Sequence, residues 1–174
     1  MPTTTPSLAR LVLVLDKLLS LADTHERDEL ARYRQLAFSF LTYDTAVSRL
    51  MASLGIQCEM RLETLEWVTK EFGLPPRASR PSSHTHQANR QRTARLVNQH
   101  FFINDPRMAC DELNHAIDKA AFSLHFYDNL MEASAMPALT PVLSAIIKQK
   151  RTEHAVLVDY LDNFAERQRE ASSA

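Results

Sequence analysis

Apolar residues recur at intervals of three and four along four segments of the chain, which is the period of an amphipathic helix. Thr5-Pro6, Asp44-Thr45, Asp105-Pro106 and Thr140-Pro141 supply the capping residues and prolines that begin helices. Gly73, with Pro75 and Pro76 just beyond it, supplies a helix end. The pattern predicts helices at about residues 6–41, 45–72, 106–132 and 141–167, with a polar connection over residues 73–105.

Four charged residues stand at positions of these stripes where an apolar side chain is expected. They are Glu26 in the first helix, Arg61 in the second, and Lys150 and Glu153 in the last. An unpaired buried ion costs several kcal/mol, so we expect these groups to form a buried charge network or to hold a ligand. A shift of one residue in the last helix would bring His154 inward in place of Glu153.

The connection between the second and third helices is too long for a simple up-and-down bundle. It lets the two hairpins pack with the second and third helices parallel. With only two glycines and 45% hydrophobic residues, the composition also argues against a β-rich fold. We therefore predict an all-α, four-helix bundle with a long crossover, in one domain over residues 1–174.

Two of the predicted helices resemble those of a known family. In the first, Tyr33 follows Glu26 by seven residues, and this resembles the first metal-ligand helix of the rubrerythrin branch of the ferritin-like superfamily. Residues 50–65 resemble the second helix of that family. The resemblance covers most of the chain and implies a ferritin-like bundle, in which glutamates and Glu-x-x-His pairs from four helices bind two metal ions.

The resemblance retains only Glu26 of that ligand set. The remaining ligand positions fall on Cys58 and Arg61, on Ala120, and on Lys150 and Glu153. Cations at these positions would repel metal ions, which argues against ferroxidase or peroxidase activity. Arg61 and Lys150 would instead neutralise Glu26 and Glu153, leaving a metal-free relic of a metal site.

A displaced metal site is the alternative. Glu112 and His115 form a Glu-x-x-His pair in the third helix, and together with Glu26 and His154 they could bind iron or manganese. The opposing interpretation is a polar flank that faces solvent. A line of three glutamates on the second helix is likewise typical of a solvated face: Glu59, Glu63 and Glu66.

The connection itself is basic. It carries no acid between Glu71 and Asp105 and five arginines, namely Arg77, Arg80, Arg90, Arg92 and Arg95. Such a segment can contact phosphates or an acidic partner surface, or it can serve as a solvated linker. It lacks the interleaved aromatic residues of a single-strand-binding site, and the net charge is −1, so we expect no nucleic-acid partner.

The first helix begins with a stretch, Leu8 to Leu21, that is apolar nearly all round. A second surface must cover it, which predicts a homodimer, or else the crossover covers it within one chain. Arg10, Asp16 and Lys17 interrupt this run, so it predicts neither a signal peptide nor a membrane span.

Two cysteines without motif spacing predict reduced thiols and a cytoplasmic protein. The pattern as a whole favours a non-enzymatic, metal-free interaction or structural protein, with a further protein partner left unidentified. The alternative is a di-iron-type oxidoreductase or metal-storage protein.

Overall fold

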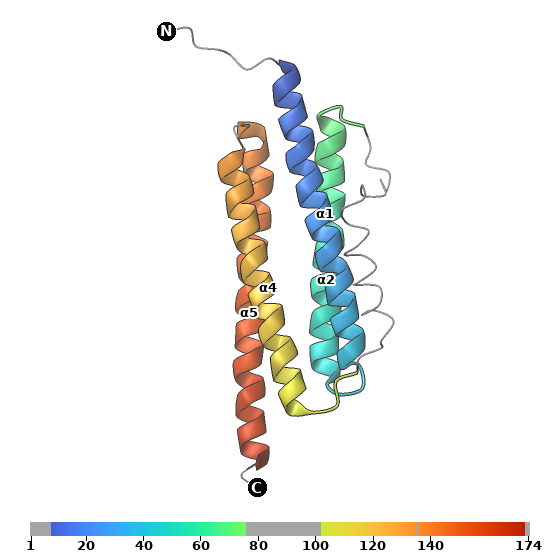
Figure 1. The fold of residues 1–174 in the computed structure, drawn as a ribbon, viewed down its shortest axis with the longest axis vertical. Helices are drawn as coiled ribbons and strands as arrows, with labels where there is room; N and C mark the ends of the chain where they lie inside the picture. Colours follow the sequence, from blue (N-terminus) through green and yellow to red (C-terminus); the bar gives the residue numbers. More distant parts are fainter. Residues whose placement is uncertain (1–7, 76–101, 135, 173–174) are drawn as a thin grey trace, which may run out of the picture. The chain divides into compact units, whose positions relative to one another are not determined.

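The computed structural model describes residues 8–75, 102–134 and 136–172. Within them the chain forms long helices and contains no strand (Figure 1). The all-α prediction is therefore confirmed. The elements are α1 (Leu8–Phe40), α2 (Thr45–Glu71), α4 (Pro106–Ala133), the short 3₁₀ helix η1 (Pro137–Leu139) and α5 (Thr140–Ser172).

The helix ends agree with the expected ones to within two residues, except at the end of α5. That helix continues to Ser172, five residues beyond the predicted end at Arg167. The apolar stripe ends at Phe164, but the residues that follow are good helix formers and need no burial to remain helical. The Arg167 guanidinium also lies 5.8 Å from the centre of the Phe164 ring, which gives this last part of the helix a local contact.

Capping residues account for both ends of α2. The Asp44 carboxylate accepts hydrogen bonds from the backbone N–H groups of Ala46 and Val47, at 2.9 and 3.1 Å. At the other end Gly73 adopts a positive φ of 64°, which a residue with a side chain rarely takes. The Gly73 N–H donates to the Lys70 carbonyl, and the Leu74 N–H donates to the Thr69 carbonyl. These two bonds are the pattern of a Schellman cap.

Contacts within the chain divide it into two compact units, Asp23–Ile103 and a second made of Met1–Ala22 with Asn104–Ala174. The first contains the later part of α1 and all of α2, here called the α1–α2 unit. These helices run antiparallel: Ser48 in the first turn of α2 donates to the Ala37 carbonyl near the end of α1, at 2.6 Å. The two helices lie close together at Gly55, where an added Cβ would be in ordinary van der Waals contact with a Leu30 methyl group, at 3.6 Å.

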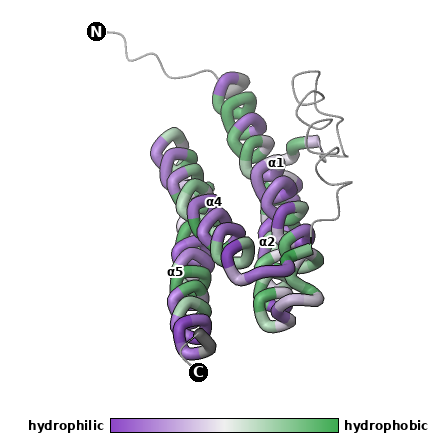
Figure 2. Tube along the Cα trace, turned by 60° about the horizontal axis from the view of Figure 1, so that its bottom comes forward, coloured by the Kyte–Doolittle hydropathy of each residue, from purple (hydrophilic) through white to green (hydrophobic). Residues whose placement is uncertain are grey.

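The second unit contains the first part of α1 together with α4, η1 and α5. Its helices α4 and α5 pack side by side as a hairpin (Figure 1). Each buries an apolar stripe at the expected spacing, with Leu113, Ala116 and Ala120 on α4 and Leu143, Ile146 and Leu157 on α5. Green and purple alternate along these helices in Figure 2, as the amphipathic pattern requires. The single-domain assignment for residues 1–174 stays a prediction.

The cap at Asp44 gives a direct test of how α2 begins. Asp44→Ala leaves two backbone N–H groups without their carboxylate acceptor, so we expect it to lower the free energy of unfolding by about 1 kcal/mol. Asp44→Asn keeps a capping oxygen and is the matched control, with a smaller loss. Chemical denaturation followed by circular dichroism measures both, and equal losses for the two variants would contradict the capping role.

Candidate functional site

A buried ion pair joins the two helices of the α1–α2 unit. Arg61 on α2 donates through Nε to Oε2 of Glu26 on α1, at 2.9 Å, and the two side chains are 2% and 0% exposed. Arg61 Nη2 also lies 3.2 Å from the sulfur of Cys58, one turn earlier on the same helix. The helical period explains this placement, because Glu26 and Arg61 both fall on the apolar stripes of their helices.

A second carboxylate that the sequence analysis missed lies beside this pair. Glu29 follows Glu26 by one turn and is 1% exposed. Arg32 Nη2 donates to it at 2.8 Å, and His25 Nε2 lies 3.8 Å from its other oxygen. The signal was the i, i+3 spacing of the two glutamates, which puts both on one face of the helix.

Glu29 affects the pKa of its arginine partner, Arg32. Burial disfavours the Arg32 cation, but the charge and hydrogen bond of Glu29, together with Tyr33, outweigh that effect and raise the pKa of Arg32. Arg32 therefore remains a cation at every physiological pH. Two buried carboxylates thus each accept a hydrogen bond from a guanidinium group.

The same side chains include a set of metal-ligand atoms. One oxygen each from Glu26 and Glu29 and the sulfur of Cys58 lie within 4.8 Å of one another, all buried. Carboxylates and a thiolate can bind a divalent ion such as zinc. Among the described residues, this is the group in which three potential metal ligands lie this close to one another. Arg61 contacts two of the three residues, so a cation bound there would have to displace it.

The other two predicted core charges form a pair within α5, in the second unit. Lys150 Nζ lies 3.7 Å from Oε2 of Glu153, and the side chains are 1% and 5% exposed. Lys150 Nζ is also 5.7 Å from the centre of the Tyr127 ring, a cation–π distance. Glu153 is buried and His154 only partly so, which decides the register that the sequence left open. One network joining all four charges remains a prediction.

The residues of the alternative metal site are not among the gathered ligands. His115 is exposed, and Glu112 and His154 are half-buried. None of these three residues belongs to the group of Glu26, Glu29 and Cys58. Of the four residues of the alternative site, only Glu26 is in that group. The five arginines of the connection, Arg77, Arg80, Arg90, Arg92 and Arg95, lie outside the described residues.

The acidic line of α2 lies at the surface. Glu63 and Glu66 are exposed and Glu59 is half-buried. A hydrogen bond from Lys70, together with its positive charge, lowers the pKa of Glu66. Glu59 forms an ion pair with Arg34 of α1, in line with a solvated, charged face.

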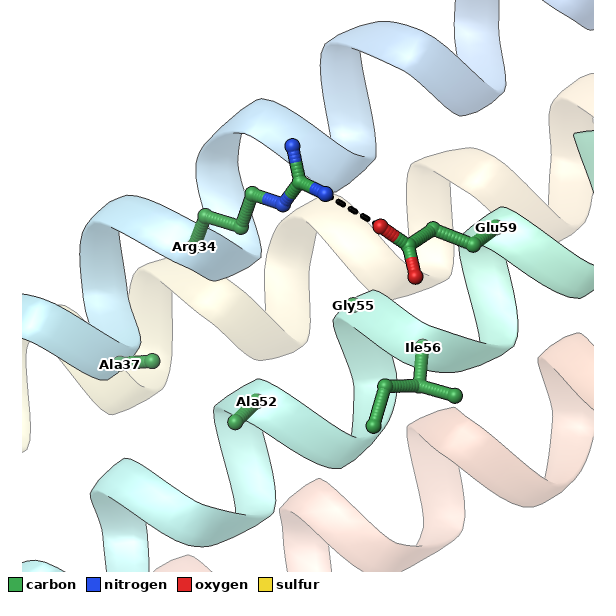
Figure 3. Close-up of a pocket in the computed structure, with 6 residues that line it drawn as sticks. All are labelled: Arg34, Ala37, Ala52, Gly55, Ile56 and Glu59. Atoms are coloured by element: carbon green, nitrogen blue, oxygen red, sulfur yellow. Dashed lines mark hydrogen bonds and ion pairs between the residues drawn. The ribbon is translucent and has the colours of Figure 1, made fainter.

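A shallow groove runs between α1 and α2 beside that ion pair (Figure 3). Its floor is made of small residues, Ala37, Ala52 and Gly55, and Ile56 stands at its edge. The Arg34–Glu59 pair bridges it, as the dashed line in Figure 3 marks. The groove holds none of the buried charges described above.

Comparisons with protein-family models, with curated proteins and with solved structures found no match. Within the described residues no helix combines the length and the apolarity that crossing a membrane requires.

The Glu26–Arg61 pair can be tested by stability measurements. Arg61→Ala or Glu26→Ala removes one partner of this buried ion pair, so each should lower the free energy of unfolding by about 3–5 kcal/mol. Replacing both with apolar residues should cost much less than the sum of the two, because neither charge is then stranded. Urea unfolding of the two single variants and the double variant gives the coupling energy.

An exposed pair on the same helix is the matched control. Arg27 donates to Asp23 at 2.8 Å in the α1–α2 unit, with Arg27 about half exposed. Arg27→Ala should therefore cost less than about 1 kcal/mol. Additive losses at Glu26 and Arg61, or a loss at Arg61 as small as that at Arg27, would contradict a structural role for the buried pair.

Proposed function

We propose that this chain is a non-enzymatic helical protein of ferritin-like, rubrerythrin-type architecture, with buried ion pairs at positions where members of that family hold metal ions. It acts as a structural or interaction protein. The fold proposed is a four-helix bundle in which a long crossover joins α2 and α4. The all-α content and the two antiparallel hairpins support this proposal.

The observation that carries the proposal is the position of the Arg61 guanidinium. It donates to Glu26 and contacts Cys58, and these are two of the three residues that could bind a metal ion. A guanidinium is a permanent cation with a fixed fork of donors, so it satisfies a buried carboxylate without any metal. Arg32 gives the same support to Glu29.

Metal binding at Glu26, Glu29 and Cys58 is the second candidate function. Three buried ligand atoms within 4.8 Å of one another favour it. It differs from the displaced iron or manganese site around Glu112, His115 and His154, because it uses a second glutamate and a thiol from the α1–α2 unit. Its ligand set suits zinc better than a di-iron centre.

Metal analysis separates the two candidates. The wild-type protein, purified after growth with iron, manganese and zinc, should contain no stoichiometric metal, because Arg61 already neutralises the site. Arg61→Ala removes the competing cation and should raise the affinity for zinc, measured by calorimetry. Adding Cys58→Ser should cancel that gain, whereas Cys110→Ser, the other free cysteine, should not. Stoichiometric metal in the wild type that is lost in Cys58→Ser would establish the second candidate.

We also propose a homodimer in the cytoplasm. Apolar side chains on the first turns of α1 support the dimer, since Leu13 is 69% exposed and Val12, Val14 and Leu21 are each nearly half exposed. Two free cysteines support a reducing compartment.

The dimer is tested by light scattering at micromolar concentration. The wild type should have twice the mass of the chain, and Leu13→Gln combined with Leu21→Gln should reduce it, because the polar side chains remove the apolar contact. Phe122→Gln, at another exposed apolar position, on α4, is the control and should leave the mass unchanged. A monomeric wild type would contradict the dimer without bearing on the metal question.

A further inference from the structure

Helix α2 exposes a row of large apolar side chains on the α1–α2 unit. Ile56, Met60 and Trp67 are 55%, 55% and 60% exposed. Their spacings of four and seven residues place them on one face of the helix. Single exposed apolar residues are ordinary, but three that are aligned on one helix face indicate a contact surface. We call these three residues the α2 stripe.

Carboxylates border the α2 stripe on its own helix. Glu63 and Glu66 lie between Met60 and Trp67 in the sequence, and both are exposed. The cation of α2 in this stretch, Arg61, is buried on the inner face of the helix and faces away from the solvent. The surface therefore combines apolar contact area with negative charge.

The glutamates of this face differ in how far they are already neutralised. Glu59 pairs with Arg34 of α1. Glu66 pairs with Lys70 at 2.8 Å, but both side chains are more than half exposed, and such a surface pair contributes little stability. Glu63 is exposed and takes part in no ion pair within the described part of the chain. A cation from outside can therefore approach Glu63 and Glu66.

The α2 stripe is continuous with the groove between α1 and α2. Ile56 belongs to both, because it also lines that groove beside Gly55 (Figure 3). The groove has a volume of about 250 Å³, below the usual range of drug-sized ligand sites, so it suits one side chain of a partner. From Ala52 in the groove to Trp67 the helix rises by about 22 Å, at 1.5 Å per residue.

The backbone of α2 limits the form that a partner can take. Its N–H and C=O groups are used within the helix, and the described residues contain no strand, so a partner cannot bind this surface by adding a strand to a sheet. Side-chain packing remains, and helices pack by placing ridges of side chains into grooves. A surface about 22 Å long matches a partner helix of about 15 residues.

We propose that the α2 stripe and the adjoining groove bind an amphipathic helix of another protein that carries lysine or arginine beside its apolar face. One apolar side chain of that helix enters the groove, its apolar face covers Met60 and Trp67, and its cations contact Glu63 and Glu66. Tryptophan and methionine are enriched in protein interfaces, and opposite charges select the partner and speed its encounter. The inference names a class of partner for the proposed interaction protein, and in that respect it rests on the proposed function.

A second copy of this chain fits the surface less well. Two α2 stripes face to face would bring Glu63 and Glu66 of one chain near the same residues of the other, and like charges oppose association. The dimer proposed above uses the first turns of α1, which leaves the α2 stripe to a different partner.

A designed peptide tests the proposal. The probe is a fluorescein-labelled helix of about 15 residues, made of leucine and lysine, with the leucines at spacings of three and four on one face. Anisotropy titration with the full-length chain at low salt should show binding, and high salt should weaken it. The matched peptide of leucine and glutamate should bind about tenfold more weakly or less, because its charges face the glutamates of α2.

The single tryptophan of the chain, Trp67, shows where the peptide binds. Binding of the leucine–lysine peptide should shield Trp67 from acrylamide quenching. Trp67→Ala should weaken binding by about tenfold or more, as expected for an aromatic residue within an interface. Glu63→Gln combined with Glu66→Gln should weaken it by about three- to tenfold. Asp159→Asn combined with Asp162→Asn, two exposed acids on α5, is the matched charge control and should leave binding unchanged.

Three results would overturn the proposal. The first is no binding of the leucine–lysine peptide, or equal binding of the two peptides. The second is an equal loss in the α2 variants and in the α5 control. The third is a Trp67 that is already shielded in the free protein, because the chain itself covers the α2 stripe if shielding survives dilution, and a second copy covers it if dilution removes shielding.

The two sets of α2 variants test the proposal independently, and circular dichroism shows which of them fold. The substituted side chains are exposed, so the helix does not depend on them for its core. Metal content enters none of these measurements. A failure here would therefore leave the metal-free core to its own test, and stoichiometric metal in the wild type would leave the peptide result unchanged.

Discussion

The Glu26–Arg61 ion pair is the interaction on which the α1–α2 unit depends. It joins residues 35 positions apart, on two helices, with both side chains almost wholly removed from water. A buried carboxylate and a buried guanidinium each carry a large desolvation cost, and only a close, hydrogen-bonded contact offsets it. The pair therefore requires one register between α1 and α2, since sliding either helix by a turn would strand both charges.

The Lys150–Glu153 pair on α5 has a different structural consequence. Its members are three residues apart on one helix, so their contact constrains no second element. The Lys150 ammonium gains its link to a neighbouring helix through the Tyr127 ring of α4. The Glu26–Arg61 pair thus sets the register between α1 and α2 through a hydrogen bond between ions. The Lys150–Glu153 pair combines an ion pair within α5 with a cation–π contact to α4.

The cluster around Glu26 also shows how closely an ion-pair core and a metal site resemble each other in residue type. Two glutamates and a cysteine on adjacent helices are suitable ligands, and the neighbouring arginines decide how they are neutralised. A metal ion and a guanidinium both supply the positive charge that buried carboxylates need. Arg61 and Arg32 supply it here through hydrogen bonds, which supports the proposal of a metal-free core.

The sequence by itself determined the helices, most of their ends and the caps at Asp44 and Gly73, because helical period and capping are local properties of the chain. The same period placed Glu26 and Arg61 on inward faces. Only the tertiary structure decided which charges meet, because partners 35 residues apart depend on the register between helices. It also revealed Glu29, whose burial depends on Arg32 and on the packing around it, and it turned Glu153 rather than His154 inward, a choice of one residue that an amphipathic pattern leaves open.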